Sequence, residues 1–250
     1  MAQAQLHTLA EIDEILPEAS AVEMVDSILY WTIQDAGNEN TLYALNSYGK
    51  IVKSIVIENA KNDDWEDLTS DNFGNIYIGD FGNNSEKRKQ FTILKIKKIN
   101  LSGQNTTSEK IIFTLPKKMK SKDFEAFFLF NENFYIFSKE KKDAIMIKVP
   151  NKTGKHEAVL IAEFELDGKD TEITSADISP DGSTVALLNH DKIWILKQFK
   201  GNNFFEGKIK DIDLDHDSQK EGIYFKNNNI LIISDERDKD EGGFIYKLKI

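Results

Sequence analysis

An internal repeat constrains the fold of this chain more than any other feature of its sequence. The repeat is clearest between Lys61 and Asn84, which begins with a polar, acidic segment at 64–67 and a short alternating run. A turn at 71–75 follows, then a second apolar run at 76–78 and a loop rich in glycine and asparagine. Alternating runs around a tight turn are typical of a β-hairpin. The unit is therefore a hairpin that carries acidic residues where its first strand begins.

Weaker copies of this unit recur about every 50 residues along the chain. The equivalent residues at the start of the five copies, here called the lead residues, are Ser20, Glu66, Glu125, Ser175 and Glu221. Two further apolar runs follow each hairpin in the first four copies. Apolar residues recur at every second position in these runs, which disfavours helical repeats. Radial repetition of four-stranded sheets is the β-propeller architecture. The sequence therefore predicts an all-β, five-bladed β-propeller that occupies residues 1–250 as a single domain.

The fifth copy is one strand short. After its hairpin, only the run Phe244–Lys249 remains before the chain ends. An alternating run from Gln5 to Ile12 precedes the first copy and belongs to none of them. We expect this N-terminal run to complete the last blade and so to close the ring.

Composition and charge limit the partners that the chain can bind. A chain of 250 residues with 40% hydrophobic residues can bury a core. Its net charge of -10 argues against nucleic acid, whose binding needs a basic face. The sequence contains no cysteine, which excludes a thiolate metal site, and no apolar run approaches the length of a membrane span.

The first residues predict export. Met1–Gln5 resembles the start of a mature chain after cleavage at an Ala-x-Ala site. We therefore expect a secreted or periplasmic protein, with a cytoplasmic protein that has a plain start as the alternative.

The lead residues predict a metal site. Innermost strands of a propeller surround a central channel, so equivalent positions face one another across it. Glu66, Glu125 and Glu221 would repel one another if all three were ionised without a cation. Ligands that offer only oxygen favour Ca²⁺. We therefore predict that Ca²⁺ is bound by Ser20, Glu66, Glu125, Ser175 and Glu221. The alternative is that these side chains only bond to neighbouring backbone.

The loops after the second strand of each copy should open on the same face as the lead residues. Both arginines of the chain, Arg88 and Arg237, lie in these loops, and a guanidinium suits phosphate or carboxylate. The residues predicted to bind an anionic small molecule are Arg88, Arg237, Asn84 and Lys139. Those predicted to activate water are Asp80, Asp235 and Glu236.

The order Ser, Glu, Glu, Ser, Glu resembles that of the calcium-activated nucleotidases, which are soluble apyrases. The motifs that carry the likeness are Glu18-Ala-Ser20-Ala, Trp65-Glu66-Asp67-Leu68, Phe124-Glu125-Ala126-Phe127, Thr174-Ser175-Ala176-Asp177 and Glu221-Gly222-Ile223-Tyr224. The resemblance implies a five-bladed propeller with calcium in its channel, which hydrolyses nucleoside diphosphates and triphosphates by means of an activated water. The chain is shorter than these enzymes.

A second resemblance implies no activity. The segments Asp64-Trp-Glu-Asp67 and Gly79-Asp-Phe-Gly-Asn-Asn84 are similar to those of a group of uncharacterised bacterial exported propellers. Three functions are therefore open at this point. They are a calcium-dependent phosphohydrolase, a non-enzymatic exported propeller with a structural calcium that binds a protein or glycan, and a calcium-dependent lactonase or phytase-like esterase.

Overall fold

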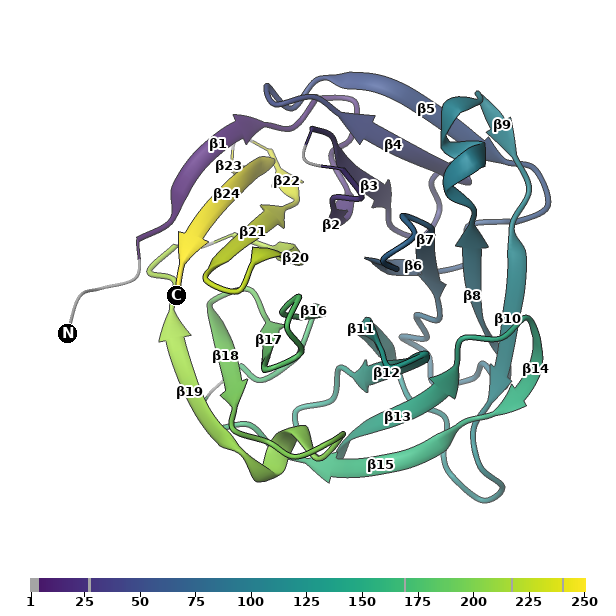
Figure 1. Cartoon of the computed structure of the whole chain (residues 1–250), viewed down its shortest axis with the longest axis vertical. Helices are drawn as coiled ribbons and strands as arrows, with labels where there is room; N and C mark the ends of the chain where they lie inside the picture. Colours follow the sequence, from purple (N-terminus) through teal and green to yellow (C-terminus); the bar gives the residue numbers. More distant parts are fainter. Residues whose placement is uncertain (1–4, 27, 169, 217, 240) are drawn as a thin grey trace.

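The protein is a ring of five β-sheets around a central axis, as seen in a computed structural model (Figure 1). The structure describes residues 5–26, 28–168, 170–216, 218–239 and 241–250. Residues 1–4, on which the prediction of export mainly depends, lie outside the described residues. The predicted all-β, five-bladed propeller is confirmed.

Each blade has four antiparallel strands in order from the axis outward. Blade 1 contains β2 (Ala19–Glu23), β3 (Tyr30–Gln34), β4 (Thr41–Leu45) and β5 (Ile51–Ile57). Blade 2 contains β6 (Trp65–Ser70), β7 (Ile76–Asp80), β8 (Phe91–Ile96) and β10 (Glu109–Thr114). Blade 3 contains β11 (Phe124–Phe130), β12 (Asn133–Ser138), β13 (Ala144–Pro150) and β15 (Val159–Phe164). Blade 4 contains β16 (Ser175–Ile178), β17 (Thr184–Leu188), β18 (Lys192–Lys197) and β19 (Lys208–Asp213).

Blade 5 is completed by the N-terminal strand, as predicted. It contains β20 (Lys220–Asn227), β21 (Ile230–Asp235), β24 (Phe244–Lys249) and then β1 (His7–Glu11). β1 pairs antiparallel with β24, from His7 opposite Lys247 to Glu11 opposite Phe244. Figure 1 shows β1 beside β24 at the outer edge of this blade. The two ends of the chain therefore close the ring, and β1 pairs with the outer edge of β24.

Two short parallel strands were not predicted. β9 (Asn105–Thr106) lies parallel to β5, and β14 (Gly154–Glu157) lies parallel to β10. Each comes from the connection between the third and fourth strands of the following blade, so blades 1 and 2 each receive a fifth strand. The other short elements are the 3₁₀ helices η1 (Lys98–Ser102) and η2 (Phe204–Glu206) and the hairpin of β22 (Arg237–Asp238) and β23 (Glu241–Gly242). The described residues contain no helix with the length and apolar character of a membrane span.

The core lies between the blades. Aromatic side chains fill the space between blades 2 and 3, where Phe91, Phe124, Phe127 and Phe134 are fully buried. Alternation along each strand sends every second side chain to one face, so each blade packs against both neighbours. The ring therefore stabilises the innermost strands from both sides, and these strands carry the candidate site.

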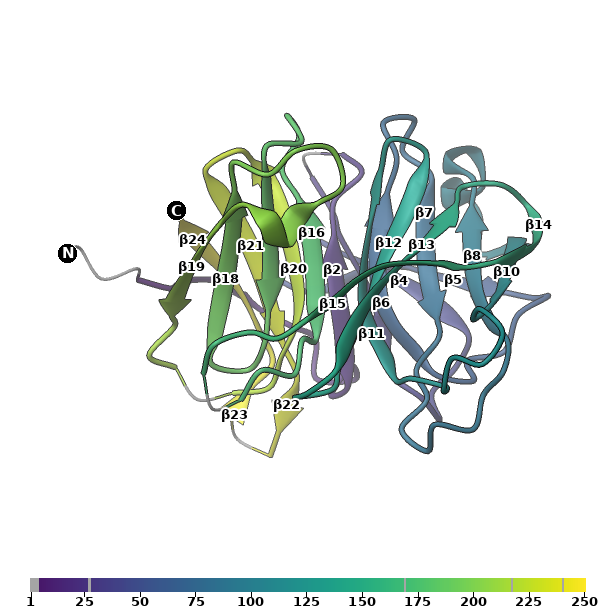
Figure 2. The same cartoon turned by 90° about the horizontal axis from the view of Figure 1, so that it is seen from below.

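The innermost strands give the channel two mouths and a closed middle. The acidic mouth lies where these strands begin and contains Glu66, Glu125 and Glu221, on the side from which β22 and β23 project in Figure 2. The far mouth lies toward their other ends and contains Glu23 and Asp177. Between the two mouths, Asp67 and the hydroxyls of Ser20 and Ser175 are buried.

Asp67 joins three blades in this closed middle. Its Oδ1 accepts hydrogen bonds from Leu68 N at 2.9 Å and from Ser175 Oγ at 3.0 Å. Its Oδ2 accepts from Phe127 N at 3.2 Å and from Ala176 N at 3.4 Å. The donors belong to β6, β11 and β16. Burial raises the pKa of Asp67, and the four donors act in the opposite direction.

Candidate functional site

Three carboxylates gather at the acidic mouth. One oxygen from each of Asp35, Asp64 and Glu66 lies within 4.8 Å of the other two. Asp35 follows β3, and Asp64 directly precedes β6. The side chain of Asn62 holds these segments together, since its Nδ2 donates to the backbone oxygens of Gln34 and Asp35 at 2.9 Å each. This arrangement offers only oxygen ligands.

The loop after β7 packs directly on these carboxylates. A Cβ atom at Gly82 would lie 1.8 Å from Glu66 Oε1 and 2.6 Å from Asp64 Cγ. A Cβ atom at Gly79 would lie 2.2 Å from the ring of Phe81. Only glycine leaves room for such an approach of backbone to a neighbouring group. Gly82 therefore lets the loop backbone approach Glu66 and Asp64, whereas Gly79 leaves room for the ring of Phe81.

Burial and like charge oppose ionisation in this cluster. Burial raises the pKa of Asp64, and with the added effect of Asp35, Asp123 and Asp80 it reaches about 6. The pKa of Glu66 is raised well above its usual range by burial and by Glu125. Like charges in a low-dielectric site have this effect unless a cation compensates for them.

Glu125 and Lys139 adjoin the cluster. The Nζ atom of Lys139 lies 2.9 Å from Oε1 of Glu125. Burial raises the pKa of Glu125 to about 8, although Lys139 opposes the shift. Glu66 lies within hydrogen-bonding reach of Glu125. Two carboxylates at this separation can share one proton or a cation.

Glu221 has a different partner. Nε2 of His190 lies 3.0 Å from Oε1 of Glu221. This hydrogen bond raises the pKa of His190, and burial opposes the shift. The three lead carboxylates therefore lie at one mouth, but each has a different environment.

The two lead hydroxyls form hydrogen bonds between blades. Ser20 Oγ donates to the backbone oxygen of Glu66 at 2.5 Å. Ser175 Oγ donates to Asp67 and accepts from Ile223 N at 3.1 Å. Both serines line the channel at equivalent strand positions, and their role as metal ligands stays a prediction.

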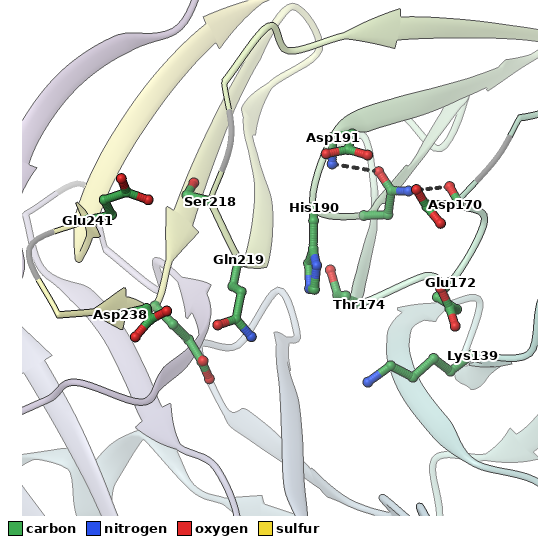
Figure 3. A pocket seen from close by; sticks show the side chains of 12 residues that line it. Lys139, Asp170, Glu172, Thr174, His190, Asp191, Ser218, Gln219, Asp238 and Glu241 are labelled. Atoms are coloured by element: carbon green, nitrogen blue, oxygen red, sulfur yellow. Dashed lines mark hydrogen bonds between the residues drawn. The ribbon is translucent and has the colours of Figure 1, made fainter.

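A cavity of about 580 Å³ adjoins the acidic mouth (Figure 3). In Figure 3 the side chains of Lys139, His190 and Gln219 point toward the same open space. The acidic residues that line the cavity are Asp170, Glu172, Asp191, Glu236, Asp238 and Glu241. The walls therefore carry far more negative than positive charge.

Of the three residues predicted to activate water, the structure brings only Glu236 to this cavity. Burial raises the pKa of Glu236, and with the added effect of Glu221 and Asp35 it reaches about 8. Asp80 accepts a hydrogen bond from Arg88 at 3.0 Å. Asp235 is 0% exposed and accepts from Ser218 Oγ, Phe244 N and Tyr246 OH. Asp80 and Asp235 therefore hold loops in place.

Of the predicted substrate-binding residues, Lys139 lines the cavity. Arg88 donates to the backbone oxygen of Gly82 at 2.9 Å and to Asp80. Arg237 donates to Glu11 at 3.1 Å and to the backbone oxygen of Ile12 at 3.0 Å. Asn84 is exposed in the loop after β7. The two guanidiniums thus stabilise loops at this face.

Comparison with protein families finds no match for this sequence, and neither does comparison with curated proteins. Among solved structures, 643 chains resemble it. One is hydrazine synthase of Kuenenia stuttgartiensis, which is 9% identical and superposes with a TM-score of 0.48. The match covers 92% of this chain and 58% of the hydrazine synthase chain. A likeness at this level carries no information about activity.

Proposed function

We propose that this protein binds calcium at the acidic mouth and hydrolyses a phosphate ester or anhydride in the adjoining cavity. Nucleoside diphosphates and triphosphates are the first substrates to test. The observation that supports the proposal is the convergence of Asp35, Asp64 and Glu66 within 4.8 Å. Calcium accepts about six to eight oxygen ligands, including water, and carboxylates without nitrogen or sulfur ligands favour it over zinc or copper.

The chemistry of the residues fits a divalent cation. The nearby cations Lys139 and Arg88 contact Glu125 and Asp80. Lys139 lowers the pKa of Asp35 and Arg88 lowers that of Asp64, but the pKa values of Asp35, Asp64 and Glu66 all remain raised. A bound cation would favour the ionised carboxylates.

The residues that line the cavity can carry out the other steps of hydrolysis. When bound, calcium would orient phosphate oxygens and lower the pKa of a water molecule. Lys139 can neutralise charge that develops on the phosphate. Glu236 can accept a proton from water, and His190, held by Glu221, can donate one to the leaving oxygen.

One observation favours a second function. The acidic walls of the cavity repel a polyanion but offer hydrogen-bond acceptors to the hydroxyls of a glycan. In that case the protein is a non-enzymatic propeller with calcium as a structural ion. A calcium-dependent lactonase or phytase-like esterase would use the same ion on a different ester.

Calcium-dependent phosphate release is the direct test of hydrolysis. With nucleoside triphosphates in millimolar calcium, we expect release that a chelator lowers roughly 100-fold, because the ion supplies several kcal/mol of charge stabilisation. Glu66→Gln should show the same loss, whereas Glu163→Gln, on the exposed strand β15, should retain activity. If no substrate in a panel of phosphorylated compounds is hydrolysed, although calcium binds, the non-enzymatic function replaces this proposal.

Calcium affinity should rise with pH. The carboxylates must lose their protons to bind the ion, and the pKa values of Asp64 and Glu125 are raised to about 6 and about 8. Affinity should therefore increase between about pH 5 and pH 8, by up to about tenfold per pH unit for each proton displaced. Isothermal titration calorimetry across this range measures the slope. An affinity that is independent of pH would remove these two residues from the site.

A further inference from the structure

The far mouth of the channel contains a second hollow, of about 570 Å³. Every blade contributes to it, including Glu23 from blade 1, Thr69 and Phe73 from blade 2, Phe130 from blade 3, Asp177 from blade 4 and Tyr224 from blade 5. The buried Asp67, Ser20 and Ser175 separate this hollow from the acidic mouth. It is therefore a compartment independent of the candidate metal centre.

The inner wall of this hollow carries a buried carboxylate without a counter-charge. Glu23 is 3% exposed, and its Oε1 accepts a hydrogen bond from Met24 N at 2.7 Å. Ser70 is its other hydrogen-bonding neighbour, so both partners are neutral. In the part of the chain that the structure describes, no lysine, arginine or histidine nitrogen lies within 4.0 Å of Glu23 or Asp177. Burying a carboxylate in this way is costly unless a cation accompanies it.

Asp177 adds a second negative charge beside Glu23. Its oxygens accept from Phe225 N at 2.6 Å and from Ile178 N at 2.8 Å, which fixes the carboxylate in position. The two acids raise the pKa of Tyr224 in addition to the effect of burial. Burial and Asp177 likewise raise the pKa of Glu23. Glu23, Asp177 and Tyr224 therefore lie in a site that lacks positive charge.

The rim of the hollow is aromatic, and one of its rings is exposed. Phe73 is 77% exposed at the tip of the β6–β7 turn, and its backbone N is held by Asp71 at 2.9 Å. Phe130 and Tyr224 lie on the same hollow. Aromatic faces attract organic cations, and they cover the alkyl stem of a long basic side chain. A hydrated metal ion would gain nothing from such a rim.

We infer that the far mouth binds an arginine side chain of a partner polypeptide. A guanidinium offers five donors in a plane, so it can bond to Glu23 and Asp177 while it stacks on an aromatic ring. The ammonium group of a lysine is a point charge, so it would pair with the two acids but would not stack on the aromatic ring. The hollow has room for the side chain and its flanking residues, and the turns of three blades surround it with polar groups that can bond to a peptide backbone.

The test is calorimetric binding of a blocked heptapeptide in which one arginine stands between glycines and serines. We expect saturable binding that weakens about tenfold or more when citrulline replaces arginine, because hydrogen bonds to charged groups are lost. Glu23→Gln, which keeps the acceptor for Met24 N, should cause a similar loss. Phe73→Ala, on the exposed rim, should weaken binding about threefold.

The matched control is Glu66→Gln at the acidic mouth, which should leave peptide binding unchanged. The proposal is overturned if Glu23→Gln and Phe73→Ala bind the peptide as the wild type does, or if the peptide does not bind at all. It is also overturned if Glu23→Gln instead removes a calcium-binding event, since the far mouth would then be a metal site.

Discussion

Millimolar calcium is expected to raise the melting temperature of this protein by roughly 5 to 10 °C. A ligand present at about 100 times its dissociation constant adds about 2.7 kcal/mol to the free energy of unfolding. In a domain of this size, each kcal/mol shifts the melting temperature by about 2 to 4 °C. The physical source is the relief of repulsion among Asp35, Asp64 and Glu66. Thermal denaturation with calcium and with a chelator measures the shift.

Variants of the cluster should change this shift in a characteristic way. In Glu66→Gln and Asp64→Asn, the calcium-dependent increase should disappear, because a ligand is lost. Without calcium, the melting temperature of these variants should be higher than that of the wild type, because a buried carboxylate beside other carboxylates has been replaced by a neutral amide. Glu163→Gln should behave as the wild type does in both conditions. An equal calcium shift in all of these proteins would contradict the proposed ligands.

Replacing Asp67 with alanine should lower the free energy of unfolding by about 3 to 5 kcal/mol. The carboxylate accepts four hydrogen bonds from β6, β11 and β16 and is 0% exposed. Alanine would leave these donors buried without acceptors, and the three blades would lose their common contact. Urea denaturation, followed by the fluorescence of the buried Trp31, Trp65 and Trp194, measures the loss.

Two further variants separate this effect from general damage to the channel. Asp67→Asn keeps the volume but presents an amide group to some of the donors, so it should cost less than alanine. Ser20→Ala removes one hydrogen bond to the backbone of Glu66 and should cost about 1 kcal/mol. If Asp67→Ala unfolds at the same urea concentration as the wild type, then Asp67 does not hold the blades together.

Repeat symmetry explains how much of the fold could be predicted from the sequence. Each copy can bury its strands only against the next copy, so five alternating units and an unassigned N-terminal run lead to a closed ring. The strands β9 and β14 could not be found in this way. They have two and four residues, too few for an alternating pattern, and they pair in parallel with strands of another blade.

The same symmetry predicted part of the candidate site. It located Glu66, Glu125 and Glu221, because equivalent positions of the copies share one mouth. It could not locate Asp35, which reaches the cluster from the loop after β3 and has no equivalent role in other copies. An acidic residue directly after a buried strand was the available signal. The arginines were assigned to substrate from their chemistry and their location in these loops. Their backbone acceptors depend on loop conformations that strand patterns do not encode.

The closed middle of the channel determines how ligands can move through this protein. Asp67 and the two serine hydroxyls leave no connection between the two mouths. A molecule that arrives at the acidic mouth must leave on the same side, so substrate and product share one route and exchange in turn. Binding at one mouth therefore does not block the other mouth. The ring has two separate binding sites on opposite faces and no continuous channel between them.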